Sequence, residues 1–273
     1  LFMILLSTSG LPITLSENAY KLSFQNHLTC DSEGDKTCNK MVSLLREPDS
    51  ASETDICYRF YRDICFEEDR SVFQAKDLRY DITVIMPGTI KNECKKTSGH
   101  YHGYINNSTY TYPEVYEVLE GRALYILQKV MNFSQEEEPV ISDLKAVYVE
   151  EGQMIIIPPF YGHCSINAGD GPLVFSNLAV VSCPLYYKPI ETKHGLSLYA
   201  CREGNGEITL IPNPCYNHVP EPSIVHPGQN EKLGIQFGHS VYHTFTSFPD
   251  TFDYLNHPED HIDQIESLLA SSK

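Results

Sequence analysis

Two histidines separated by a single residue, His100 and His102, lie in a part of the chain that is predicted to form strands. Side chains alternate along a strand, so these two imidazoles project from the same face, about 7 Å apart along the chain. Two imidazoles at that spacing can share one metal ion. Isolated histidines are more often core or surface residues, so the pair indicates a metal only if further ligands reach the same face.

Two later segments carry residues with the right chemistry to complete a metal site. Residues 113–121 run from a proline to a glycine, and strand alternation places Glu114 on one face of this segment and Glu117 on the other. Residues 152–167 supply a turn glycine, an apolar run, a proline and then His163. The sequence thus offers a carboxylate and a third imidazole, each within a predicted strand.

The elements that must position these side chains are strands between residues 78 and 181. Residues 80–86 alternate and are β-branched, and a Pro-Gly turn closes them. Further strands are predicted at 99–104, 114–120, 123–130, 146–149, 153–157, 162–167 and 173–181, with turn signals about every ten residues. No long helical periodicity interrupts this stretch, which argues against a parallel α/β sheet. The pattern predicts an all-β sandwich or barrel.

The two ends of the chain differ from this central part. Residues 1–70 are largely irregular in pattern and are predicted to form an N-terminal extension that packs on a barrel at 71–190. Residues 191–273 are predicted to contain a hairpin, an extended proline-rich arm at 212–227 and a terminal helix at 258–269. The chain is therefore expected to have one barrel with an extension at each end.

The composition is that of a globular protein with an acidic excess. Of 273 residues, 41% are apolar, and 20 basic against 36 acidic side chains leave a formal net charge of −16. This field repels nucleic acid and anionic lipid, so neither is an expected partner. An anionic substrate would need a metal ion, backbone N–H groups or a few lysines near its site to offset this negative charge. The chain has nine cysteines but no CxxC pair, which predicts reduced thiols in a cytoplasmic protein. Its apolar opening is only six residues long and has no basic start, so no signal peptide is predicted.

Residues 99–121 and 152–167 resemble the two motifs of the cupin fold, a double-stranded β-helix or jelly-roll barrel. The ligands of one divalent metal that this resemblance implies are His100, His102, Glu114 and His163. Such a set leaves two positions of an octahedral ion open and suits Fe²⁺ or Mn²⁺, while Zn²⁺ or Ni²⁺ also fit. Eleven residues separate His102 from Glu114, more than in common cupins, and are predicted to form a widened loop at the barrel mouth. The long spacing also raises Glu117 and Glu120 as carboxylate ligands, but strand parity excludes Glu117 and the distance to Gly121 favours Glu114.

A closer resemblance is to the cupin-type (archaeal-type) glucose-6-phosphate isomerases. It covers about residues 70–190 and is carried, in matching order, by 78–88, 96–102, 114–116 and 158–163. The resemblance implies a homodimeric enzyme of glycolysis and gluconeogenesis that interconverts glucose 6-phosphate and fructose 6-phosphate. The phosphate-contacting positions that it implies are Thr83, Thr97, Gly99 and Tyr187. Hydroxyls and a glycine N–H can hold a phosphate without a buried lysine, and Lys95 and Lys96 are expected to add positive charge nearby.

The predicted catalytic residues are Glu114 and Tyr116. Moving hydrogen between C1 and C2 needs a base, while a metal acts as a Lewis acid at the carbonyl. Glu114 is the nearby carboxylate that the motif supplies, and Tyr116 faces the same cavity, where it would orient a hydroxyl or assist proton movement. Because a tightly ligated glutamate is a poor base, we expect Glu114 at the edge of the coordination shell.

Two other functions stay open from the sequence. The first is a cupin isomerase or dioxygenase that acts on another substrate, and the second is a non-catalytic cupin that senses a sugar or a metal. A dioxygenase would need no phosphate pocket, so Thr83, Thr97 and Gly99 discriminate between the enzymes. Threonine and tyrosine are also ordinary barrel residues, and it is the family pattern that distinguishes these positions.

Overall fold

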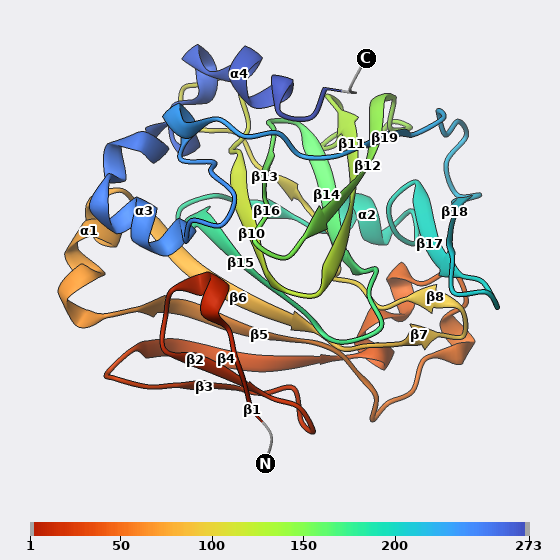
Figure 1. The fold of residues 1–273 in the computed structure, drawn as a ribbon. Helices are drawn as coiled ribbons and strands as arrows, with labels where there is room; N and C mark the ends of the chain where they lie inside the picture. The colour runs from red at the N-terminus through yellow and green to blue at the C-terminus, as the bar shows by residue number, and fades with distance from the viewer. Residues whose placement is uncertain (1–2, 271–273) are drawn as a thin grey trace.

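Two sheets pack face to face and form a barrel in the computed structural model, which describes residues 3–270 (Figure 1). The larger sheet contains, in spatial order, β13 (Met154–Ile157), β10 (Glu114–Glu120), β15 (Leu173–Val180), β6 (Leu78–Ile85), β5 (Ile56–Cys65) and β4 (Thr29–Thr37). The smaller sheet contains β14 (Tyr161–Asn167), β11 (Arg122–Val130), β12 (Ile141–Glu150) and β19 (Ser223–Val225). All pairings in these sheets are antiparallel except that of β12 with β19. The predicted all-β cupin barrel is confirmed.

Alternation along the strands builds the core between the two sheets. On β10, Tyr116 and Val118 are buried in the barrel interior with Tyr125 and Phe175, whereas Val115 packs in a separate cluster on the outer face of the same sheet. Both faces of the larger sheet are therefore covered, which explains why β10 and β15 are apolar on both sides.

Most predicted strands agree with the observed ones to within a residue or two. There are two exceptions. The strand predicted at 146–149 is much longer in the structure, where β12 spans Ile141–Glu150. The strand predicted at 99–104 is shorter, because the structure has only β9 (Tyr101–His102), paired with β16 (Leu185–Tyr186). A backbone bridge to His163 holds His100 outside this strand. Gly99 has a positive φ of 73° just before it, so the chain turns here instead of running on as a regular strand.

The N-terminal segment contributes far more regular structure than its sequence predicted. Strands β1 (Met3–Leu5), β2 (Ile13–Ser16) and β3 (Leu22–Phe24) form a separate small sheet, and β4 and β5 extend the larger barrel sheet. The expectation of an irregular N-terminus was wrong because β4 is an edge strand with mostly exposed or half-buried residues, so no apolar alternation marks it. Leu1 and Phe2, part of the apolar opening run, lie outside the described residues. The division of the chain into an N-terminal extension, a barrel and a C-terminal extension, with boundaries at residues 70 and 190, stays a proposal.

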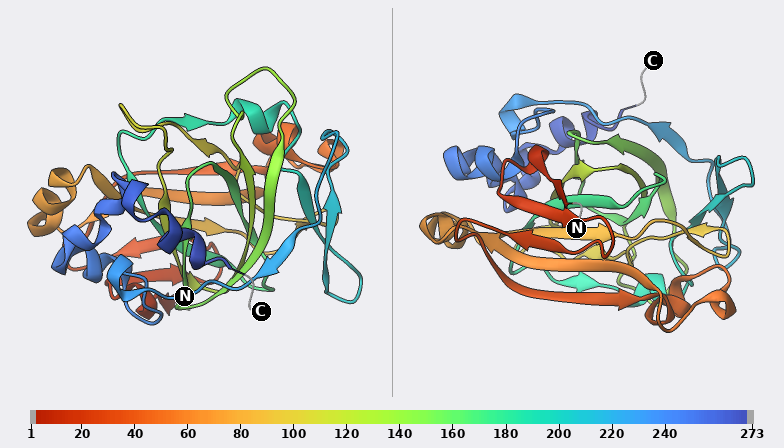
Figure 2. Two further views of the ribbon diagram at one scale, coloured as in Figure 1. Left: turned by 90° about the horizontal axis from the view of Figure 1, so that it is seen from above. Right: turned by 60° about the horizontal axis from the view of Figure 1, so that its bottom comes forward.

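The C-terminal segment returns to the larger sheet and covers its outer face beside the N-terminal strands (Figure 2). The Ser240 hydroxyl donates to Ser9 O across this contact. A hairpin of β17 (Leu198–Arg202) and β18 (Ile208–Pro212) and a terminal helix α4 (Ile262–Ser267) lie where their sequence patterns placed them. Helix α3 (Val241–Ser247), which the sequence did not predict, is too short and too rich in β-branched and aromatic residues to give a helical signal.

The remaining elements are short connections. They are the helices α1 (Arg70–Ala75) and α2 (Lys188–Glu191), the strands β7 (Thr89–Ile90) and β8 (Glu93–Cys94), and 3₁₀ turns at Ser7–Ser9, Cys38–Leu44, Pro48–Ser50, Glu67–Asp69, Glu231–Leu233, Pro249–Leu255 and Pro258–Asp260. Within residues 3–270, no helix has both the length and the apolar character needed to cross a membrane.

Candidate metal centre

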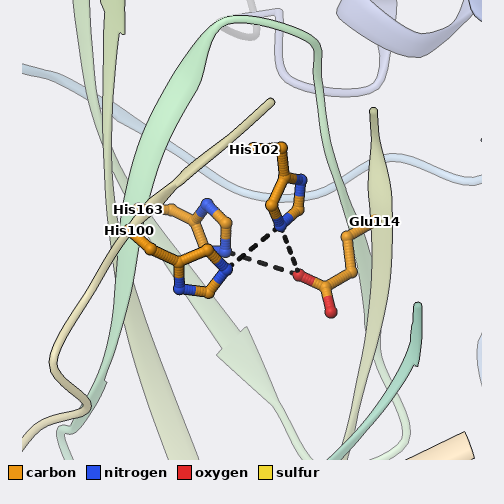
Figure 3. Close-up of side chains that lie close together, drawn as sticks. All are labelled: His100, His102, Glu114 and His163. Atoms are coloured by element: carbon orange, nitrogen blue, oxygen red, sulfur yellow. Dashed lines mark hydrogen bonds and ion pairs between the residues drawn. The ribbon is translucent and has the colours of Figure 1, made fainter. Parts of the chain in front are cut away.

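The four predicted ligands converge inside the barrel, with their side chains directed toward one another (Figure 3). Each of His100, His102, Glu114 and His163 offers one ligand atom, and these atoms all lie within 4.8 Å of one another. The Nε2 atoms of His100 and His102 are 3.1 Å apart, and Glu114 Oε2 lies 3.2 Å from His102 Nε2 and 3.5 Å from His163 Nε2. Adjacent ligands of an ion bound at about 2.1 Å stand roughly 3.0 Å apart. The four groups therefore have nearly the spacing of a coordination sphere.

Different elements carry the ligands to this point. Glu114 is the first residue of β10 and pairs with Ile157 of β13, while His163 lies on β14 in the opposite sheet. His100 and His163 exchange two backbone hydrogen bonds, with N···O distances of 3.2 and 3.1 Å. The short strand β9 then carries His102 to the same place. A long-range pairing, rather than one regular strand, brings the two halves of the site together.

The imidazoles are oriented as they would be around a metal. In His102, Nδ1–H donates to Tyr112 O at 2.8 Å, and in His163 Nδ1 lies 3.3 Å from Tyr161 O, so both Nε2 lone pairs face the centre. Burial, together with the neighbouring imidazoles, holds the pKa of His100 well below its ordinary value, and burial also lowers the pKa of His163. Neutral imidazoles whose lone pairs face one another repel unless a cation or a proton lies between them. The donor set therefore fits a divalent ion.

The carboxylate of Glu114 is held by two neighbours that differ in role. Asn177 Nδ2 donates to Glu114 Oε1 at 2.7 Å, and the Tyr116 hydroxyl donates to Glu114 Oε2 at 2.8 Å. Burial acts to raise the pKa of Glu114, but the hydrogen bonds with His102 and His163 outweigh it and hold that pKa well below its ordinary value. Glu114 is thus a carboxylate with one oxygen anchored and the other directed to the histidines.

Tyr116 stands beside the ligands as a neutral hydroxyl. Its oxygen lies 3.1 Å from His163 Nε2 as well as 2.8 Å from Glu114 Oε2. Burial and the charge of Glu114 raise the pKa of Tyr116 well above its usual range. The hydroxyl therefore keeps its proton and can donate it in a hydrogen bond at the centre.

Asn177 is a site residue that the sequence reasoning missed. It lies on β15, opposite Tyr116 of β10, in a strand that is otherwise largely apolar. A polar side chain in such a buried strand needs a partner. That pattern was the available signal, and the partner is the carboxylate of Glu114.

A cavity of about 220 Å³ opens beside the candidate ligands. All four predicted phosphate positions line it, namely Thr83, Thr97, Gly99 and Tyr187. Tyr187 is 40% exposed, and the centroid of its ring lies 5.4 Å from that of His100. The Oγ1 atom of Thr97 accepts a hydrogen bond from Ser165 N at 3.0 Å, which fixes its side chain at the wall. The structure thus brings the predicted phosphate positions and the predicted ligands to one cavity.

The two lysines expected to add positive charge do not line this cavity. Lys95 Nζ lies 2.7 Å from Asp55 Oδ1, and Lys96 Nζ lies 2.5 Å from Glu93 Oε1. Both lysines are buried, so their charge is neutralised within the protein. The expectation was wrong because each lysine has a carboxylate partner away from the cavity: Glu93 lies three residues before Lys96, and Asp55 comes from a distant part of the chain.

The long loop between His102 and Glu114 is ordered and supports the site. Its backbone accepts the hydrogen bond from His102 at Tyr112 O, and Thr111 Oγ1 accepts one from Phe160 N at 2.6 Å. Residues Tyr104 and Thr111 form a backbone bridge across the loop. The insertion therefore widens the wall and also fixes the orientation of one predicted ligand.

Comparison with known proteins identifies a matching family and similar proteins. The family described as Glucose-6-phosphate isomerase (GPI) matches residues 35–217. The glucose-6-phosphate isomerase of Thermococcus litoralis is 33% identical over 138 residues, which cover 50% of this chain and 64% of that protein. The enzyme of the same name from Pyrococcus furiosus is 27% identical over 165 residues, covering 57% and 78% respectively. The alignment thus spans just under two thirds of the Thermococcus protein.

Solved structures overlap the chain only in part. An oxalate decarboxylase from Lactobacillus farciminis in complex with formate has a TM-score of 0.31 and 20% identity, covering 45% of this chain and 28% of that one. The coconut allergen cocosin has a TM-score of 0.33 and 14% identity, covering 56% and 31%.

Proposed function

The chain belongs to the glucose-6-phosphate isomerase family, and from this premise we propose that it interconverts glucose 6-phosphate and fructose 6-phosphate with the help of one divalent metal ion. The observation that carries the proposal is the convergence of three imidazoles and one carboxylate beside a cavity that also contains the phosphate positions. A site for metal alone would not need those positions. The combination supports a phosphorylated sugar as the substrate.

The residues that would hold the ion are His100, His102, Glu114 and His163. Three imidazoles and one carboxylate leave two positions of an octahedral ion open, which supports Fe²⁺ or Mn²⁺ in preference to an ion that needs only four ligands. When bound, such an ion would supply Lewis-acid polarisation of the sugar carbonyl.

The phosphate would be held by neutral donors at one end of the cavity. Thr83 and Thr97 supply hydroxyls, and the backbone N–H of Gly99 donates to no acceptor among the described residues. A side chain at residue 99 would approach His163 O to 3.0 Å, so glycine lets this backbone pass close to His163. Tyr187 lies at the exposed rim and would close over the phosphate side.

The proton that moves between C1 and C2 would be carried by Glu114 with the help of Tyr116. Glu114 is ionised at neutral pH, and its Oε2 is the carboxylate atom that faces the other candidate ligands. Asn177 fixes the other oxygen, so Oε2 is directed to the Tyr116 hydroxyl and to the candidate metal ligands. The neutral Tyr116 hydroxyl can orient a substrate oxygen and stabilise the carboxylate after it has released the proton.

The test is a coupled assay of fructose 6-phosphate conversion by the purified full chain. We expect turnover after loading with Fe²⁺ or Mn²⁺, loss of turnover with a chelator, and recovery when the metal is restored. In the loaded protein, Glu114→Gln should lower turnover per bound metal by at least about a hundredfold. Near-normal turnover in this variant would remove Glu114 from the mechanism. A metal-loaded wild type without turnover would instead support a non-catalytic cupin that binds a sugar or a metal.

We further propose that the protein acts as a homodimer in the cytoplasm. All nine cysteines are free thiols, a state that is typical of cytoplasmic proteins. Light scattering of the purified chain tests the oligomeric state, and a mass of one chain would contradict a dimer.

A further inference from the structure

A sugar phosphate meets an electrostatic problem on the way to this site. The chain carries a formal net charge of −16, and the phosphate is a dianion near neutral pH. Lys95 and Lys96, which would have compensated it, are paired with buried or half-buried carboxylates outside the cavity. Apart from the histidines, the basic side chains among the described residues that line the cavity are Arg62 and Arg79.

A buried carboxylate holds these two arginines together. Arg62 Nη1 lies 3.1 Å and Arg79 Nε 2.9 Å from the same oxygen, Oδ2 of Asp81, whose side chain is fully buried. The other oxygen of Asp81 accepts a hydrogen bond from Asp63 N at 2.9 Å. Asp81 is therefore fixed at both oxygens, and the group of two guanidinium ions and one carboxylate carries an excess positive charge.

Each arginine keeps donors for a ligand. A guanidinium group has five N–H donors, and only one nitrogen of Arg62 and one of Arg79 bonds to a described residue. Their side chains are 31% and 35% exposed, although both line the cavity. Free N–H groups on two fixed guanidinium ions match the geometry of phosphate oxygens, to which arginine binds through two parallel hydrogen bonds.

The strand register places this pair beside the phosphate positions. Alternation along β6 puts Arg79, Asp81 and Thr83 on the same face, with successive members about 7 Å apart, and all three line the cavity. Arg62 reaches the same point from the neighbouring strand β5. Asp81 pairs in register with Asn177, the residue that anchors Glu114. The arginines thus line the same cavity as Thr83, from the same face of the sheet.

We propose that Arg62 and Arg79, oriented by Asp81, form an anion clamp that binds the phosphate group of the sugar substrate together with Thr83. The inference rests on the proposed function for the identity of the substrate. The clamp itself predicts arginine-dependent binding of inorganic phosphate. Asp81 is a positioning residue in this arrangement, because it touches the arginines and not the ligand.

Calorimetric titration of the metal-loaded full chain with inorganic phosphate at low ionic strength tests the clamp. In Arg62→Gln and Arg79→Gln, the glutamine amide can still donate to Asp81, but the positive charge and the remaining N–H donors of the guanidinium group are lost. We expect the Kd for phosphate to rise at least about tenfold in each variant. The KM for fructose 6-phosphate should rise similarly, with kcat within about threefold. Arg122→Gln is the matched control, since Arg122 pairs with Glu150 outside the cavity and should leave both constants unchanged.

Phosphate affinity within twofold of the wild type in both Gln variants would overturn the clamp. If a Gln variant shows no cooperative thermal transition, Arg62→Lys and Arg79→Lys carry the test, because they keep a cation for Asp81 but lose the planar fork. A Kd unchanged in both Lys variants would then overturn the clamp, whereas a rise of about fivefold would support it. Arginine-dependent phosphate binding by a chain without isomerase activity would contradict the proposed function and leave the clamp standing. Turnover of fructose 6-phosphate together with phosphate binding that does not depend on the arginines would support the proposed function and contradict the clamp.

Discussion

Replacing Glu117 by glutamine should stabilise the protein at pH 8.5 and change its stability little at pH 5. Glu117 follows Tyr116 on β10 but points to the opposite side, away from the metal centre, as strand parity predicted. There, Oε2 accepts hydrogen bonds from Val241 N at 3.2 Å and Ser176 Oγ at 3.4 Å, while Oε1 has no partner among the described residues. Burial raises the pKa of Glu117 from 4.5 to about 8.

The sign and size of the effect follow from this pKa. Because the folded pKa lies above the unfolded one, the folded state holds a proton on Glu117 that the unfolded state releases between about pH 4.5 and 8. The stabilising contribution of this group is therefore complete below pH 4.5 and is lost as the pH rises to about 8. At about 1.4 kcal/mol per pH unit, the interval sets an upper limit of about 5 kcal/mol. Glutamine resembles the protonated acid at every pH, so the variant avoids this loss.

The assay is urea unfolding of the wild type and Glu117→Gln at pH 5 and pH 8.5. We expect the variant to gain at least about 1 kcal/mol in free energy of unfolding at pH 8.5, and much less at pH 5. Glu136→Gln, on an exposed loop, corrects for the removal of one negative charge from an acidic protein. An equal difference at both pH values, or a less stable Glu117→Gln at pH 8.5, would refute the reasoning.

Two further substitutions test how the site is built. Asn177→Leu removes the donor to Glu114 Oε1, so it should weaken divalent metal binding by about 10- to 100-fold, as measured by competition with a chelator. An unchanged metal affinity would show that Asn177 does not orient the carboxylate. Gly99→Ala places a side chain at a φ of 73° and at 3.0 Å from His163 O. The variant should therefore lower the free energy of unfolding by about 1–3 kcal/mol, and it should also weaken phosphate binding. Gly171→Ala, where an added carbon meets nothing within 4 Å, is its control, and equal losses in the two variants would contradict a special role for Gly99.

The barrel strands could be predicted because their signals are local, whereas the set of candidate ligands was predicted from the resemblance to the cupin motifs. Alternation along β10 separates Glu114 from Glu117, and the structure sends the first to the candidate metal centre and the second to α3. Turn glycines and prolines mark where the strands end, so most boundaries agree closely. These features depend on neighbouring residues in the chain and need no knowledge of the tertiary fold.

What the sequence did not reveal depends on pairing between distant segments. Arg62 stands in a segment that was expected to lie outside the barrel, and it reaches the cavity only because β5 pairs with β6. The ion pair of Lys95 with Asp55 likewise joins residues that are far apart in the sequence. The position of a charge along the chain therefore does not tell which charges face the substrate.

The claim on which the whole account depends is that His100, His102, Glu114 and His163 bind one ion together. Elemental analysis of the purified chain, after loading with Mn²⁺ or Fe²⁺ and removal of free metal, measures this most directly. The account predicts one divalent ion per chain in the wild type and in the control His218→Ala, whose histidine is exposed, and far less than one in His163→Ala. A wild type that retains no metal, or a folded His163→Ala that retains a full equivalent, would contradict it.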